Sequence, residues 1–125
     1  MTYTMTHHER VLVHEAGHAW VAQMLGYEVE AVEIEEVEER GLGGRTMFTG
    51  TLTAEHTMLV AVAGMAAEAV AMGTERYEPH TGAQGDVQKA KAAYRTYMPK
   101  ATTRETEQAV EAAYHAVVKK MRHMA

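Results

Sequence analysis

Apolar and polar positions along the chain predict two helices, one opening the sequence and one near its centre. Thr6 and Glu9, three residues apart, form a capping-box pattern, and the apolar-rich stretch after them ends at Gly26. Glycine is common just beyond the last turn of a helix. An alanine-rich stretch between Thr53 and Gly73 has the same kind of start and stop signals. We therefore expect helices over 7–25 and 54–72.

Two further helices are predicted in the second half of the chain. After an irregular stretch at 74–85, a helix is expected from about Asp86, ending before Pro99 because the residue preceding a proline resists the helical conformation. Thr102 and Glu105 form another capping-box pattern. The last helix, moderately amphipathic, should then continue nearly to the C-terminus.

The only β signal lies between the first two helices. Residues 28–37 place Val and Ile among Glu in partial alternation, which favours a half-exposed strand, although a helix stays an alternative because Glu also favours helices. Residues 40–44 (RGLGG) indicate a turn, and 45–50 (RTMFTG) a second short strand. The predicted fold class is α+β, mainly α with a small β-hairpin or sheet.

Length and composition limit the functions that this chain can have. Its 125 residues suit a single domain, 1–125, and its hydrophobic content of 46% suits small-residue helices more than an aromatic-rich sandwich. The net charge of -5, with acidic residues concentrated in 28–39, argues against a nucleic-acid partner. Because the chain has no cysteine, any metal must use His, Asp or Glu.

Two features of the sequence, its first ten residues and its longest apolar run, predict where in the cell the protein is located. The first ten residues do not have the basic region and apolar core of a secretory signal. The longest apolar run, 58–67, is well short of the roughly 18 residues that suggest a membrane span. We therefore expect a cytoplasmic protein with no membrane span.

The stretch HEAGH, residues 14–18, carries the clearest chemistry. His14 and His18 lie one turn apart on the predicted helix, so both imidazoles can face one point, and neutral imidazole is a good zinc ligand. Glu15 would stand beside the metal without binding it, where a carboxylate can take a proton from a water held by the metal. The alternative is that the histidines are hydrogen-bonded core residues or surface residues. Gly17 favours close packing at this turn, since glycine inside a helix costs about 1 kcal/mol relative to alanine.

A catalytic zinc site usually has three protein ligands and one open position, so a third ligand is expected elsewhere. Asp86 and Glu68 are the carboxylate candidates; helix capping would explain Asp86, and a hydrogen bond to a zinc-bound histidine would explain Glu68. The other candidates are histidines, namely His80, His56, His7 and His8. We expect His7, His8, His115 and His123 to be solvated.

Four segments together resemble the zinc metallopeptidase domain of the FtsH-type AAA+ proteases. They are HEAGHAW (14–20), GGRTMF (43–48), AGMAAEAVAMG (63–73) and TGAQGDVQKA (81–90), and the resemblance covers about residues 9–95. It implies a zincin-like fold and a Zn²⁺ ion held by His14, His18 and Asp86. It also implies that Glu15 activates water and that Glu68 has a supporting role.

The chain departs from this family in several places. It has no GxxxxGK[ST] nucleotide-binding pattern, so we expect the peptidase part alone, without the AAA+ or membrane parts. Met65 stands where the family usually has an arginine, and no proline follows RTMFTG. The expected substrate is flexible or unfolded polypeptide; a separate unfoldase or adaptor partner and a homo-oligomer both stay open.

Two classes of function are compatible with these residues. The first is a zinc-dependent endopeptidase, and the second is a metal-binding, catalytically silent module that uses the same fold to bind a partner. Glu15 favours the enzyme, because a scaffold has no need of a general base. A peptidase of another HExxH family is a third interpretation, which the TGA..D element disfavours.

Overall fold

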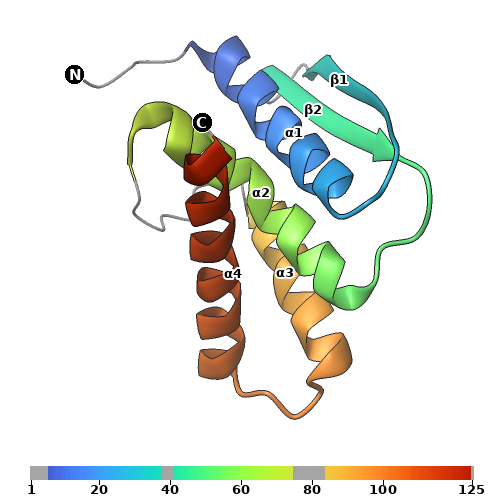
Figure 1. The fold of residues 1–125 in the computed structure, drawn as a ribbon, viewed down its shortest axis with the longest axis vertical. Coiled ribbons are helices and arrows are strands. Elements are labelled where there is room, and N and C mark those ends of the chain that lie inside the picture. The colour runs from blue at the N-terminus through green and yellow to red at the C-terminus, as the bar shows by residue number, and fades with distance from the viewer. Residues whose placement is uncertain (1–5, 38–40, 75–83, 125) are drawn as a thin grey trace.

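Four helices and one β-hairpin make up the fold, seen here in a computed structural model (Figure 1). The structure describes residues 6–37, 41–74 and 84–124. In chain order the elements are α1 (His7–Met24), β1 (Val29–Val37), β2 (Gly41–Phe48), α2 (Ala54–Met72), α3 (Gln84–Tyr97) and α4 (Thr103–Met124). The predicted α+β class, mainly helical with a small antiparallel sheet, is confirmed at this level.

The helix boundaries follow the capping signals in the sequence. The Thr6 hydroxyl accepts a hydrogen bond from the Glu9 backbone N–H, and the Glu9 carboxylate accepts one from the Thr6 N–H, both at 3.1 Å. Thr102 and Glu105 form the same reciprocal pair ahead of α4. Gly73 ends α2 in the left-handed conformation, with φ of 74°. These boundaries confirm the helix predictions to within about two residues.

β1 and β2 pair as an antiparallel hairpin, with Val32 opposite Thr46 and Ile34 opposite Gly44. The hairpin was predicted, but the turn predicted at 40–44 is wrong for 41–44, which belong to β2. The part of the hairpin between the strands, 38–40, lies outside the described residues. Gly44 explains the difference, because a Cβ there would come within 2.6 Å of the Glu15 Cγ. Glycine in this segment lets the strand approach α1 closely.

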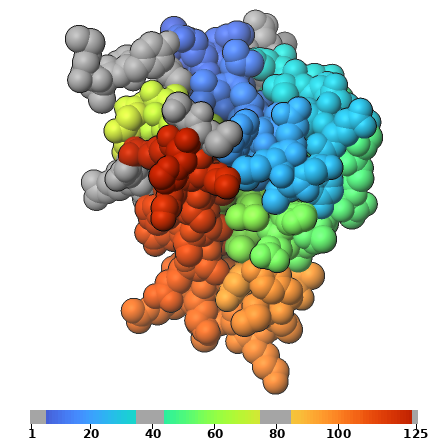
Figure 2. All heavy atoms as spheres, viewed as in Figure 1, coloured from blue at the N-terminus to red at the C-terminus, as the bar shows by residue number. Residues whose placement is uncertain are grey.

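α2 is the central helix of the fold. In Figure 1 it runs between α1 with the hairpin on one side and α3 with α4 on the other, and it packs against all three other helices. Its length and mean hydropathy would also fit a membrane span, judged by composition alone. Its burial among the other helices gives a different reason for that composition. On the outer surface, α1 and the hairpin cover the upper right of the face seen in Figure 2, and α4 the left.

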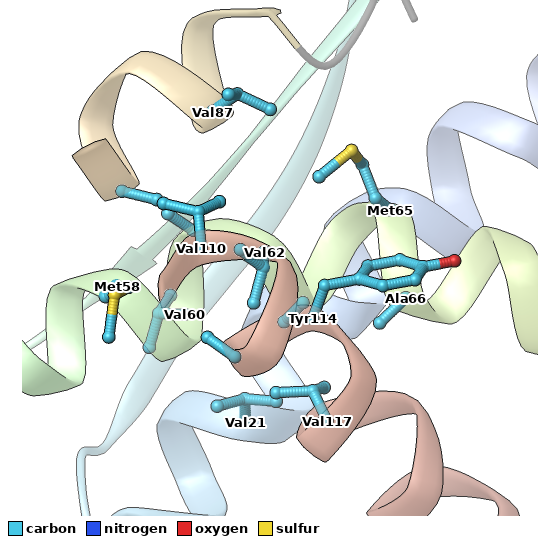
Figure 3. Close-up of a cluster of buried hydrophobic side chains, with 14 of the residues drawn as sticks. Val21, Met58, Val60, Val62, Met65, Ala66, Val87, Val110, Tyr114 and Val117 are labelled. Atoms are coloured by element: carbon cyan, nitrogen blue, oxygen red, sulfur yellow. The ribbon is translucent and has the colours of Figure 1, made fainter. Parts of the chain in front are cut away.

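The hydrophobic core joins α2 to its helical neighbours and is built largely from small residues. Figure 3 shows the ring of Tyr114, from α4, beside Met65 and Ala66 of α2. The apolar side of α4 is buried, with Val110 and Tyr114 almost fully enclosed, as its amphipathic pattern predicted. The buried hydrophobic residues of α2 and α1 are Met58, Val60, Ala61, Val62, Ala63, Met65, Ala66, Ala69, Val21 and Ala22.

The approach of α1 to α2 depends on glycine. A Cβ at Gly17 would lie 2.5 Å from the Ala63 carbonyl oxygen and 2.6 Å from the Ala67 Cβ. A Cβ at Gly64 would overlap the imidazole ring of His14. The close packing predicted for Gly17 is therefore confirmed, and the close crossing brings the histidines of α1 against α2.

Candidate metal centre

His14 and His18 lie one turn apart on α1, and their rings are held by different partners on α2. The His14 Nδ1–H donates to Glu68 Oε2 at 2.8 Å, and the His18 Nδ1–H donates to the Val60 carbonyl oxygen at 2.6 Å. The two rings stand edge to face, with centroids 4.8 Å apart. Because both Nδ1 atoms are engaged, the Nε2 atom of each ring is the one directed at the shared site.

Asp86 faces both Nε2 atoms from the first turn of α3. Its Oδ2 lies 2.7 Å from His14 Nε2 and 3.2 Å from His18 Nε2. α3 begins at Gln84, two residues before Asp86, so Asp86 lies within the first turn and the interpretation of Asp86 as the helix cap is wrong. Its carboxylate is turned toward α1 instead. The structure therefore brings together the three residues that the sequence and the family resemblance selected.

These three residues fit a zinc ion by their chemistry. Their candidate ligand atoms all lie within 4.8 Å of one another, so the cluster could hold a metal ion. Histidine ligands in zinc sites usually donate their other ring N–H to a carboxylate or a backbone carbonyl, which fixes the tautomer that leaves Nε2 for the metal. The acceptor is the Glu68 carboxylate for His14 and the Val60 backbone carbonyl for His18. Two imidazoles and one carboxylate also match the number of protein ligands in catalytic zinc sites.

The electrostatics of the metal-free cluster depend on His14. Burial lowers the pKa of His14, but hydrogen bonds with Asp86 and Glu68, and the charges of both carboxylates, outweigh it and raise the pKa to about 9. Burial raises the pKa of Asp86, but His14 and His18 outweigh it and hold that pKa well below its usual value. The metal-free protein thus holds a protonated His14 between two carboxylates, and a metal at Nε2 would replace a proton.

Glu15 lies next to the cluster in sequence but contacts the hairpin. Only 7% of its surface is exposed, and the Thr46 hydroxyl lies 2.9 Å from its backbone oxygen and 3.2 Å from its Oε1, within donating distance of both. Gly44 and Thr46, two residues apart on β2, both contact Glu15. The position of this carboxylate is thus set by β2.

The remaining candidates differ in environment. Glu68 contacts His14 through Nδ1, as expected of a supporting residue, and is absent from the group of candidate ligands. His56 Nδ1 and the Tyr27 hydroxyl form a hydrogen bond of 2.8 Å. His80 lies outside the described residues. The histidines expected to be solvated, His7, His8, His115 and His123, are all exposed.

Sequence reasoning missed several parts of the site. Arg10 donates through Nε to Glu68 Oε1, and it precedes His14 by four residues, so helical spacing could have placed it on the same face. Thr46 and the Val60 carbonyl could not have been found in this way. Their roles depend on how the hairpin and α2 pack against α1.

The chain was also compared with known proteins. Neither protein-family models nor curated protein sequences gave a match. The interpretation of the site therefore depends on its own geometry and on the motifs quoted above.

Proposed function

We propose that the protein is a zinc-dependent endopeptidase with a zincin-like, FtsH-type peptidase domain, acting on unfolded or flexible polypeptide in the cytoplasm. The observation that carries this proposal is the convergence of His14 Nε2, His18 Nε2 and Asp86 Oδ2 on one point, with Glu15 directly after the first histidine. His14, His18 and Asp86 would hold the ion. When bound, zinc supplies a Lewis acid that polarises a carbonyl and makes water acidic, toward a pKa of ~7.

Glu15 is the general base in this proposal. The Thr46 hydroxyl is within donating distance of Oε1, which leaves Oε2 to take the proton of the attacking water. The same oxygen then returns the proton to the nitrogen of the leaving amine. Burial of Glu15 beneath β2 limits the number of positions that the carboxylate can adopt. The carboxylate therefore accepts the proton from water and donates it to the amine from nearly the same position.

β2 is the element best suited to hold the substrate. Within the described part of the chain it pairs with β1 alone, and we expect an extended peptide to pair with its other edge. The strand also contacts the general base through Gly44 and Thr46. A peptide paired with β2 would therefore lie near Glu15, whereas a folded domain cannot offer an extended segment.

Replacement of Glu15 by Gln tests this function directly. The variant should bind one zinc ion per chain like the wild type, and its cleavage of casein or an unfolded peptide should fall by on the order of 100-fold or more, because the base is lost. Metal analysis and the cleavage assay are run on the same preparations. Equal cleavage by the two proteins, or zinc binding without any cleavage by the wild type, would favour the catalytically silent binding module instead.

A further inference from the structure

We infer that Arg10 is a positioning residue of the metal centre, acting on His14 through Glu68. Arg10 lies four residues before His14 on α1, and its Nε donates to Glu68 Oε1. The other oxygen of the same carboxylate, Oε2, accepts the His14 Nδ1–H at 2.8 Å. One carboxylate thus joins the guanidinium to the imidazole, with a separate oxygen for each. The inference rests on the zinc site proposed above.

The three side chains differ in burial: Glu68 and His14 are largely enclosed, and Arg10 is partly exposed to solvent. The Glu68 side chain is 4% exposed and that of His14 12%, whereas that of Arg10 is 40% exposed. A buried carboxylate is stable in one orientation only when donors fix it. Arg10 supplies such a donor from the surface, so a solvent-accessible side chain sets the orientation of a buried metal ligand.

The contrast with His18 explains why His14 needs this support. The His18 Nδ1–H donates to the carbonyl oxygen of Val60, which the backbone of α2 holds rigidly. The His14 Nδ1–H donates to a side chain with three rotatable bonds. If Glu68 turns, His14 loses the acceptor that keeps the proton on Nδ1 and leaves Nε2 for the metal.

The expected sign of the effect separates positioning from simple charge. A cation near a zinc site repels the ion, so loss of the Arg10 charge alone would strengthen zinc binding. Loss of the orientation of Glu68 would weaken it, and partners of this kind typically affect metal affinity by 10- to 100-fold. Weaker binding in a variant without the guanidinium therefore indicates positioning.

A double-mutant cycle on zinc affinity tests the inference. Zinc dissociation constants are measured by chelator competition for the wild type, Arg10→Met, Glu68→Ala and the double variant. Methionine keeps an unbranched apolar stem and removes the donor. Arg10→Met should weaken zinc binding by about 10-fold in the wild-type background and should cause no loss of affinity in the Glu68→Ala background, where only the charge effect remains. Arg104→Ala, which removes an exposed arginine from α4, is the matched control and should bind like the wild type.

The other outcomes are equally informative. Wild-type or tighter affinity in Arg10→Met, or an equal loss in both backgrounds, would overturn the inference. The thermal unfolding midpoint of each variant is measured with zinc removed; if Arg10→Met is destabilised there, Arg10→Lys, which restores a donor and the charge, must recover affinity or the inference fails. If the wild type binds no zinc, the proposed function fails. If it binds zinc and cleaves peptide while Arg10→Met keeps full affinity, only the role of Arg10 is wrong.

Discussion

Three side chains from two helices form the candidate ligand set, His14 and His18 from α1 and Asp86 from α3. Asp86 faces both histidines, whereas Glu68 contacts His14 from the opposite ring nitrogen. A carboxylate at Nδ1 supports a ligand, and a carboxylate opposite Nε2 can itself be one. The two acidic residues therefore have different expected effects on metal binding.

Replacement of Asp86 by Ala should remove most of the zinc affinity. The variant loses one of three ligands, whereas Glu55→Ala removes an exposed carboxylate from the first turn of α2 and leaves the cluster intact. Zinc content after dialysis, measured side by side for the two variants, checks this expectation. Equal zinc content in both would mean that Asp86 is not a ligand.

His14 makes both metal binding and metal-free stability depend on pH. Its pKa rises from 6.5 to about 9 in the folded protein, so its contribution to stability is complete below pH 6.5 and is lost as the pH rises through about 9. The pKa of Asp86 is lowered, so its contribution is present above about 3.8, the ordinary value, and is lost at lower pH. Among the described residues, the charged groups that face His14 are Asp86 and Glu68, with Arg10 behind Glu68.

Thermal unfolding in the presence of a chelator should therefore show a midpoint that falls between pH 6.5 and about 9. The alkaline decline should be much smaller in His14→Gln. Zinc binding at about pH 7.5 should release close to one proton per ion, which calorimetry in buffers of different ionisation enthalpy measures. Zinc binding without proton release would show that His14 is already neutral.

At the scale of elements, the crossing of α1 over α2 sets the distance between the histidines and their partners. Gly17 and Gly64 permit this crossing because a Cβ at either would overlap the facing helix or the His14 ring. Gly44 has the same role between β2 and Glu15. The metal centre therefore depends on three glycines that contribute no side-chain chemistry.

Gly17→Ala should destabilise the fold by about 1 to 3 kcal/mol, since its Cβ meets a backbone oxygen that cannot move easily. Gly64→Ala should weaken zinc binding as well, because it displaces the His14 ring. Gly85→Ala is the control: among the described residues, and apart from its chain neighbours and its own helix backbone, an added Cβ would meet no atom within 4 Å, so the change should be neutral or stabilising by up to about 1 kcal/mol. Urea unfolding and zinc affinity of the three variants test this, and equal effects at positions 17 and 85 would contradict it.

Helices that have capping residues near their ends could be predicted from the sequence, whereas the contacts between helices and strands could not. α1, α2 and α4 begin after threonines, Thr6, Thr53 and Thr102, and α2 ends at Gly73, and these capping roles are encoded within a few positions. The turn predicted at 40–44 was wrong for 41–44, because Gly44 serves the contact of β2 with α1. In the site, the HEAGH spacing is local, whereas the choice of Asp86 needed the resemblance to a family. The Thr46 and Val60 contacts follow only from packing.

For the whole molecule, the proposed activity favours substrates that can offer an extended segment to β2. This sequence contains no nucleotide-binding loop of the GxxxxGK[ST] kind, and its described residues form four helices and one hairpin. A casein-like disordered protein should be cleaved at least about 100-fold faster than a stable globular protein, because cleavage follows the unfolded fraction of the substrate. Rapid digestion of the folded protein, or stimulation of the purified chain by ATP, would contradict this.

The candidate ligands lie on two helices, His14 and His18 on α1 and Asp86 in the first turn of α3, so metal binding should affect the local opening of α3. Both helices pack against α2, and an ion bound to His18 and Asp86 would add a removable cross-link that closes the loop of chain between them. Backbone amides in the first turn of α3 should then exchange hydrogen for deuterium more slowly with zinc than with a chelator. Amides of α4 around Val110 and Tyr114, held by the core, should change little. Metal occupancy would thereby set how often one end of α3 opens, independently of any cleavage.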